Sequence, residues 1–227
     1  MQTVLRYLQP RFQRKTFTGL PLTIIGISSA FIVATFYGLT DAVTSSDYIT
    51  ALDTHMTQFL FNHRTLFLDE VFFAITQFGG LYLVSALIIA TLIFFYLQNK
   101  RSYIWPLVVT LSGAEATTTL IKLAIHRDRP GQSVAFYLEK SFSFPSGHAT
   151  ISMALYGFLI YFFLREWYRS NSSRIAARAL MGLIILVGFS RIYLGVHYLS
   201  DVLAGYLVGA LWVVFGISFK EWRARIK

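Results

Sequence analysis

Long, nearly uninterrupted apolar stretches dominate this chain, and the polar residues gather in the shorter segments between them. Six of these stretches approach or exceed the roughly 20 helical residues that cross the hydrocarbon core of a bilayer. They lie near residues 19–41, 71–97, 103–125, 147–164, 179–195 and 200–219. The pattern predicts an all-α fold, a polytopic bundle of about six transmembrane helices that forms one membrane-embedded domain over residues 1–227.

Three segments need separate interpretation. The second stretch contains Gly79-Gly80, which favours a tilt, a kink or an interfacial part within it. Residues 42–66 place apolar side chains at roughly helical spacing among polar ones. This spacing indicates a helix at the outer membrane interface, with a partly packed loop as the alternative. Residues 1–18 are expected to be a cytoplasmic segment before the first stretch, which is too long for the h-region of a signal peptide and is expected to remain as a membrane anchor.

The composition limits the kinds of chemistry that this chain can carry out. Of the 227 residues, 55% are hydrophobic and 14% are charged, which is too apolar for an ordinary soluble domain of this size. The absence of cysteine excludes disulfides, thiolate metal sites and cysteine nucleophiles. Any covalent chemistry would therefore use histidine, serine, threonine, lysine or a carboxylate.

The positions of the charges matter more than the formal net charge of +9. Of the 20 lysines and arginines, 14 stand beside every second end of the apolar stretches, in the positive-inside pattern of membrane proteins. These 14 are Arg6, Arg11, Arg14, Lys15, Lys100, Arg101, Arg165, Arg169, Arg174, Arg178, Lys220, Arg223, Arg225 and Lys227. We therefore expect no nucleic-acid partner, and a plasma (inner) membrane protein with both termini in the cytoplasm.

The six other cations would then lie on the outer side of the membrane. They are Arg64, Lys122, Arg127, Arg129, Lys140 and Arg191. A site that binds an anion would require this kind of exception to the charge rule.

Three short clusters bring ionisable residues to the ends of the apolar stretches, where such side chains are costly and indicate function. In the last cluster, His197 and Asp201 are four residues apart, which on a helix would put them on one face. The carboxylate could then keep one imidazole nitrogen protonated and leave the other free to attack. Since a lone membrane histidine is more often a packing residue, this pair alone does not establish a nucleophile.

The middle cluster, Pro145-Ser146-Gly147-His148, opens the fourth stretch. Ser146 is suited to cap a helix, Gly147 would let a ligand approach the backbone, and the amides at a helix start attract anions. His148 would project beside a bound anion as a proton donor or acceptor. Without His148, an ordinary helix cap would be the better interpretation.

The first cluster supplies cations. Lys122 and Arg129 are seven residues apart, so they would share a face if the third helix continued to Pro130. Arg191 comes from the outer end of the fifth stretch. Each cation alone is better explained as an interfacial side chain. Together with two histidines, however, three cations suit the charge of a phosphoryl group in its transition state.

The remaining polar residues receive structural interpretations. Glu115 lies on nearly the same face as Lys122, and we expect it to bond that lysine or another helix. Five residues are interpreted as solvated charges of the outer loop that could at most touch a substrate head group. These are His126, Arg127, Asp128, Glu139 and Lys140.

Together, the three clusters resemble the signature of the type 2 phosphatidic acid phosphatase family, which vanadium haloperoxidases share. The likeness covers residues 122–201 and includes the gaps within the first and third motifs. It implies a metal-independent phosphatase without a cofactor. By motif position, His197 would form a phosphohistidine, Asp201 would orient it, and His148 would protonate the leaving group and then help to activate water. The residues that would hold the phosphoryl oxygens are Lys122, Arg129, Ser146, Gly147 and Arg191.

The predicted function is therefore hydrolysis of a lipid phosphate at the outer membrane face, with a phosphorylated lipid as the partner. Undecaprenyl pyrophosphate, phosphatidylglycerophosphate, phosphatidic acid and the phosphates of lipid A all fit. The sequence leaves open which of them is used, whether phosphate is hydrolysed or transferred, and the oligomeric state. Six lipid-facing spans disfavour a soluble-type haloperoxidase. A non-catalytic phospholipid-binding or transport protein would need the cations, but not His148 or Asp201.

Overall fold

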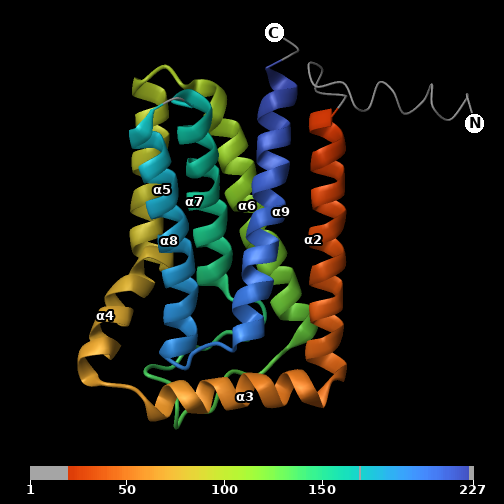
Figure 1. Ribbon diagram of the computed structural model, residues 1–227, viewed down its shortest axis with the longest axis vertical. Helices are drawn as coiled ribbons and strands as arrows, with labels where there is room; N and C mark the ends of the chain where they lie inside the picture. The colour runs from red at the N-terminus through yellow and green to blue at the C-terminus, as the bar shows by residue number, and fades with distance from the viewer. Residues whose placement is uncertain (1–19, 169, 225–227) are drawn as a thin grey trace, which may run out of the picture.

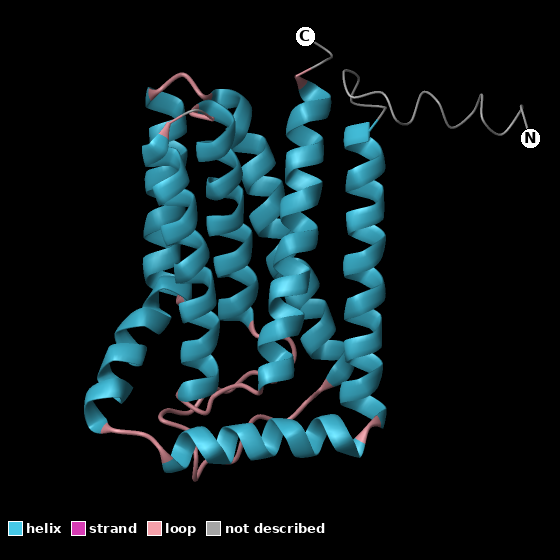
Figure 2. Ribbon diagram, in the orientation of Figure 1, coloured by secondary structure: helices cyan, strands magenta, loops and turns pink. Residues whose placement is uncertain are grey.

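The computed structural model describes residues 20–168 and 170–224, and every regular element in these residues is a helix (Figure 2). In chain order the α-helices are α2 (Leu20–Ser45), α3 (Asp47–Asn62), α4 (Leu66–Thr76), α5 (Leu81–Leu97), α6 (Ile104–Ile125), α7 (Gly147–Glu166), α8 (Asn171–Tyr193) and α9 (Leu199–Arg223). Short 3₁₀ turns cover Gln77–Gly79 and Arg101–Tyr103. The predicted all-α fold is confirmed, while the predicted segment 1–18 lies outside the described residues.

Helices α2 and α5 to α9 run side by side as a bundle (Figure 1). By length and apolar composition, α2, α7, α8, α9 and the segment Arg101–Ile125 can each cross a membrane. A sixth candidate span consists of α4 with its 3₁₀ turn and α5, which are bent by 44° at the break between them. The expectation of about six spans therefore agrees with the fold, and the break between Gly79 and Leu81 agrees with the kink expected at the glycine pair.

The break in this sixth span coincides with the glycine pair. A Cβ atom on Gly79 would lie 2.7 Å from Val187 Cγ1 and 3.1 Å from His148 Cβ. Only glycine therefore lets the backbone approach α7 and α8 this closely. Gly80 is extended and begins α5 as its N-cap. This close approach places the end of α4 beside the first turn of α7, where His148 lies.

The amphipathic segment forms a helix that lies across one end of the bundle (Figure 1). Residues Asp47–Asn62 form α3, which excludes the loop alternative for this part of 42–66. Its surface carries exposed Tyr48 and Phe59, whereas Asp53 is only 2% exposed and turned toward the protein. α3 thus covers the loops that join α6 to α7 and α8 to α9 (Figure 1).

The basic residues segregate by end of the bundle. Among the described positive-inside residues, Lys100, Arg101, Arg165, Lys220 and Arg223 lie at the end where α2 begins and α9 ends. Arg174 and Arg178, in the first turns of α8, lie toward that same end. The six other cations belong to the opposite end, on which α3 lies, in the loops and the helix turns next to them. The charge asymmetry expected from the sequence is therefore a property of the folded bundle.

Candidate active site

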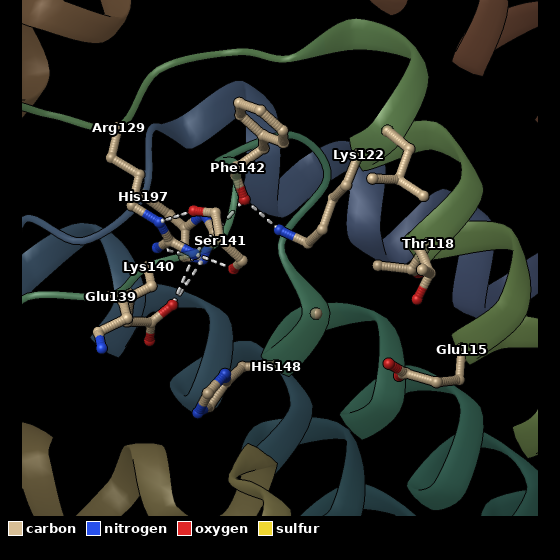
Figure 3. Close-up of a pocket in the computed structure, with 13 residues that line it drawn as sticks. Glu115, Thr118, Lys122, Arg129, Glu139, Lys140, Ser141, Phe142, His148 and His197 are labelled. Carbon is tan, nitrogen blue, oxygen red and sulfur yellow. Dashed lines mark hydrogen bonds and ion pairs between the residues drawn. The ribbon is translucent and has the colours of Figure 1, made fainter.

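The three sequence clusters converge at the α3 end of the bundle. They surround a cavity of about 550 Å³ between α6, α7 and the loops (Figure 3). Of the predicted site residues, Lys122, Arg129, Gly147, His148 and His197 line it. The three others, Ser146, Arg191 and Asp201, are fully buried behind this lining.

His197 presents an unprotonated nitrogen toward the cations. Nη1 of Arg129 lies 3.1 Å from Nε2 of His197, and a guanidinium can only donate a hydrogen bond. Nε2 therefore carries the lone pair, and the proton of the neutral ring lies on Nδ1, which is 3.4 Å from Asp201 Oδ2. Burial and the positive charges of Arg191 and Arg129 hold the pKa of the His197 imidazole well below its ordinary value. The ring is consequently neutral at neutral pH.

The way His197 and Asp201 meet differs from the prediction. They do not share a face of one helix, because α9 begins at Leu199 and His197 precedes its N-cap, Tyr198. Asp201 is the third residue of α9, and its carboxylate accepts the amide hydrogen of Tyr198 at 2.9 Å. This capping interaction folds the chain back so that the carboxylate and the imidazole still face each other.

Ser143 is a buried third partner of His197 and Asp201, and the sequence did not reveal it. Its hydroxyl donates to Asp201 Oδ2 and lies 3.4 Å from His197 Nδ1. Only its position shortly before the Pro145–His148 cluster could have suggested a role. The serine adds a further fixed contact to the carboxylate oxygen that faces the imidazole.

Arg129 reaches the site from a loop rather than from α6. The predicted shared helical face with Lys122 is wrong, because α6 ends at Ile125 and His126 adopts a left-handed conformation with φ of 52°. Arg129 is instead anchored by backbone carbonyls, with Nε donating to Ser141 at 2.6 Å and Nη1 donating to Val196 at 2.7 Å. Lys122 donates to the carbonyl oxygen of Phe142 from the last turns of α6.

Arg191 is the most deeply buried cation of the site. It lies in the last turn of α8, where sequence analysis placed it, and is 0% exposed. Its guanidinium donates to the hydroxyls of Thr76, at 2.9 Å, and Tyr137. It also pairs with the carboxylate of Glu139.

Glu139 is not the solvated loop charge that the sequence suggested. Its carboxylate pairs with Arg191 and with Nη2 of Arg129 at 2.6 Å, and Oε2 lies 4.0 Å from Nε2 of His197. Burial alone would raise the pKa of Glu139, but the positive charges of Arg191 and Arg129 lower it to about 2. The two guanidinium groups therefore already hold an anion beside the imidazole lone pair.

The middle cluster supplies unpaired polar groups. Ser146 occupies the N-cap position of α7, but its side chain makes no capping hydrogen bond, contrary to expectation. Its buried Oγ has no partner among the described residues. The Ser146 amide donates to the carbonyl oxygen of Asp201 at 2.9 Å, which ties the second cluster to the third. The Ser146 hydroxyl is thus left without a partner in the described part of the chain, directly before Gly147, which lines the cavity.

Two further sequence interpretations change. Glu115 was expected to bond Lys122 or another helix, but it lines the cavity, is exposed, and makes neither bond within the described part of the chain (Figure 3). Arg127 was taken for a solvated charge, yet it is largely buried and pairs with Asp53 and Asp201. The loop sequence alone did not distinguish Arg127 from the exposed charges around it.

Comparison with known proteins agrees with the fold and the motifs. Residues 103–225, which contain all three clusters, match the PAP2 superfamily, and the chain belongs to this superfamily. It is therefore a multi-pass membrane phosphatase of the PAP2 type, and the predicted family is confirmed.

Two matches agree with this assignment, and a third shares the fold. The chain is 33% identical to phosphatidylglycerophosphatase B of Bacillus subtilis (strain 168) over 170 residues. The aligned region covers 72% of this chain and 82% of that protein. The crystal structure of a transmembrane PAP2 type phosphatidylglycerolphosphate phosphatase from Bacillus subtilis matches with a TM-score of 0.77 and 26% identity, over 86% of this chain and 96% of that one. Aquifex aeolicus LpxE matches with a TM-score of 0.59 and 22% identity, over 73% and 94%, and this likeness concerns the fold alone.

Proposed function

We propose that this membrane lipid phosphatase removes the terminal phosphate of a phospholipid, with phosphatidylglycerophosphate as its preferred substrate, through a phosphohistidine on His197. One observation carries the proposal. Arg129 and Arg191 hold the Glu139 carboxylate 4.0 Å from Nε2 of His197, the ring nitrogen that carries the lone pair. A phosphate bound by the same guanidinium groups would place its phosphorus in front of that lone pair. The similarity to phosphatidylglycerophosphatase B supports the choice of lipid.

The proposed reaction has two displacements. Nε2 of His197 attacks phosphorus, a P–N bond forms, and the P–O bond to the lipid breaks. His148 gives its proton to the departing oxygen, and Asp201 stabilises the imidazolium that results. In the second step His148 takes a proton from water, which attacks phosphorus and releases phosphate from His197. Lys122, Arg129 and Arg191 offset the charge of the phosphoryl oxygens, and the Ser146 hydroxyl and Gly147 amide donate to them.

The proposed orientation follows from charge. The described basic residues at one end of the bundle correspond to the positive-inside rule, so both termini would lie in the cytoplasm. The cavity would then open at the outer face of the plasma membrane, where a lipid can present its phosphate while its chains stay in the bilayer.

Phosphate release from a lipid panel tests this function. The purified protein in vesicles would be compared on phosphatidylglycerophosphate, phosphatidic acid, undecaprenyl pyrophosphate and lipid A, with His197→Ala as the control. We expect kcat/KM to be highest for phosphatidylglycerophosphate, by about tenfold or more. Equal rates on all four lipids would contradict the preferred substrate. No release from any of them would contradict the function itself.

Chelation should leave the activity almost unchanged, because three protein cations already supply the charge that a divalent ion would provide. The measurement is phosphate release before and after dialysis against excess chelator, with a metal-dependent phosphatase treated in parallel. Loss of activity that a divalent ion restores would refute the metal-free mechanism.

The Glu139→Gln variant should bind inorganic phosphate about tenfold more tightly than the wild type, because the amide no longer competes for the two guanidinium groups. Without phosphate it should be less stable, since Arg191 loses its buried counterion. Competitive inhibition by phosphate and thermal unfolding with and without phosphate measure the two effects. Lys140→Gln, which changes the neighbouring cavity residue, is the matched control. Unchanged or weaker inhibition would show that the carboxylate does not compete with phosphate.

A further inference from the structure

A buried chain of charges lies behind His197 and leads away from the cavity. Nη1 of Arg127 donates to Asp201 Oδ1 at 2.6 Å, and Nη2 donates to Asp53 Oδ2 at 2.8 Å. The side chains of Asp53 and Asp201 are 3% and 0% exposed, and that of Arg127 is 12% exposed. None of the three lines the cavity. Their contacts therefore act on the site from behind, without reaching a bound substrate.

Asp201 uses both of its carboxylate oxygens in fixed contacts. Oδ1 accepts from Arg127, while Oδ2 accepts from the Ser143 hydroxyl and the Tyr198 amide and faces Nδ1 of His197. A carboxylate bonded on both sides has one orientation available to it. Since Arg127 supplies the Oδ1 contact, its loss would free the carboxylate to rotate about its own side-chain bonds.

Asp53 connects this series of buried charges to α3, the helix that lies across the end of the bundle. It accepts the Ser200 amide hydrogen at 3.1 Å through Oδ1 and the Ser200 hydroxyl through Oδ2. The Arg127 guanidinium also lies over the Tyr198 ring, 4.5 Å from its centroid. Asp53 of α3 is therefore hydrogen-bonded both to Arg127 and to the first turn of α9, from which Asp201 projects.

The positive charge of Arg127 lies between the negative charges of Asp53 and Asp201. Burial alone would lower the pKa of Arg127, but Asp201 and Asp53 raise it, so the guanidinium is permanently charged. This fixed cation holds Oδ1 of Asp201 in place, so Oδ2 stays directed at Nδ1 of His197. The Nδ1 proton of His197 thus keeps Oδ2 as its partner, and Nε2 keeps its lone pair.

We propose that Arg127 and Asp53 are positioning residues, which fix the orientation of Asp201 and make the geometry of the His197 nucleophile depend on α3. This inference rests on the proposed function, because it assigns a purpose to the carboxylate that orients His197. It also explains why a helix at the membrane surface carries a buried aspartate on its inner face.

Three variants test this assignment in vesicles with phosphatidylglycerophosphate. Arg127→Gln removes the cation, Arg127→Lys keeps the charge but cannot bond both carboxylates in the same way, and Asp53→Asn weakens only the α3 side. Arg165→Gln is the matched control, because it removes the Arg165–Glu221 pair at the opposite end of the bundle. For each protein, kcat, KM and the pH profile of kcat would be measured.

We expect Arg127→Gln to lower kcat about 100-fold with KM little changed, Asp53→Asn to lower it about tenfold, and Arg127→Lys to fall between wild type and Arg127→Gln. Loss of the positive charge should also raise the pKa of His197, so the fall in activity on acidification would begin at higher pH in Arg127→Gln. A purely structural ion pair would not move this limb of the profile. Arg165→Gln should behave as wild type.

The proposal is overturned if folded Arg127→Gln keeps a kcat near that of wild type, or loses activity with an unmoved acid limb and no recovery in Arg127→Lys. If Arg127→Gln does not give a monodisperse protein, the proposal is tested with Asp53→Asn instead. A kcat and a pH profile equal to those of wild type in Asp53→Asn would overturn the proposal. The proposed function is judged separately by wild type and His197→Ala: if both release phosphate equally, the nucleophile assignment fails whatever the Arg127 variants do.

Discussion

Replacing His197 with alanine should reduce phosphate release by at least about 10⁴-fold while the protein remains folded. Nε2 of the imidazole carries a lone pair and lies 4.0 Å from the carboxylate held by Arg129 and Arg191. Without the imidazole, water would have to attack directly and the covalent intermediate could not form. The fold should survive, because the ring contributes mainly side-chain contacts within the site.

The matched control for this variant is His55→Ala, which removes an exposed histidine of α3. If the reaction of the wild type with a lipid that carries a labelled phosphate is quenched rapidly, labelled phosphate should remain bound to the protein. The same experiment with His197→Ala should leave none bound. Full turnover by folded His197→Ala, or trapped phosphate in that variant, would refute the nucleophile assignment.

Replacing Arg191 with methionine should lower kcat/KM by about 10³-fold and the free energy of unfolding by about 3–5 kcal/mol. Arg191 is fully buried and pairs with Glu139. Its removal leaves the Glu139 carboxylate with Arg129 as its one remaining ion-pair partner among the described residues, in a site that water reaches poorly. It also removes a cation that would stabilise the phosphoryl group. Lipid-phosphate kinetics and denaturant unfolding in detergent measure the two losses.

The double variant Arg191→Met with Glu139→Gln separates stability from catalysis. Removing both charges should restore most of the free energy of unfolding, because no uncompensated carboxylate remains, but it should not restore activity. A double variant as unstable as Arg191→Met would show that the ion pair is not the source of the loss. Recovery of activity in the double variant would contradict the proposed role of Arg191 in holding phosphate.

Short-range patterns in the sequence were sufficient for the bundle and for the selection of most site candidates. Apolar runs of helical length predicted the spans, and the amphipathic spacing within 42–66 indicated α3. Lys122, His148 and His197 stood out because ionisable side chains are costly at the ends of apolar segments. Their roles in catalysis remain predictions until the variants are measured.

Only the tertiary structure distinguished Arg127, Ser143 and Glu139 from the polar residues around them. The connection from α6 to α7 has no hydrophobic period, so its sequence does not indicate which side chains are buried. Burial there comes from partners that are remote in the chain: 74 residues separate Arg127 from Asp201, and 147 separate Asp53 from Ser200. The local pattern determined the helices because a helix depends on neighbours three or four residues away. The completed site depended on the fold, since α3 and the helix ends enclose these charges only when the bundle is assembled.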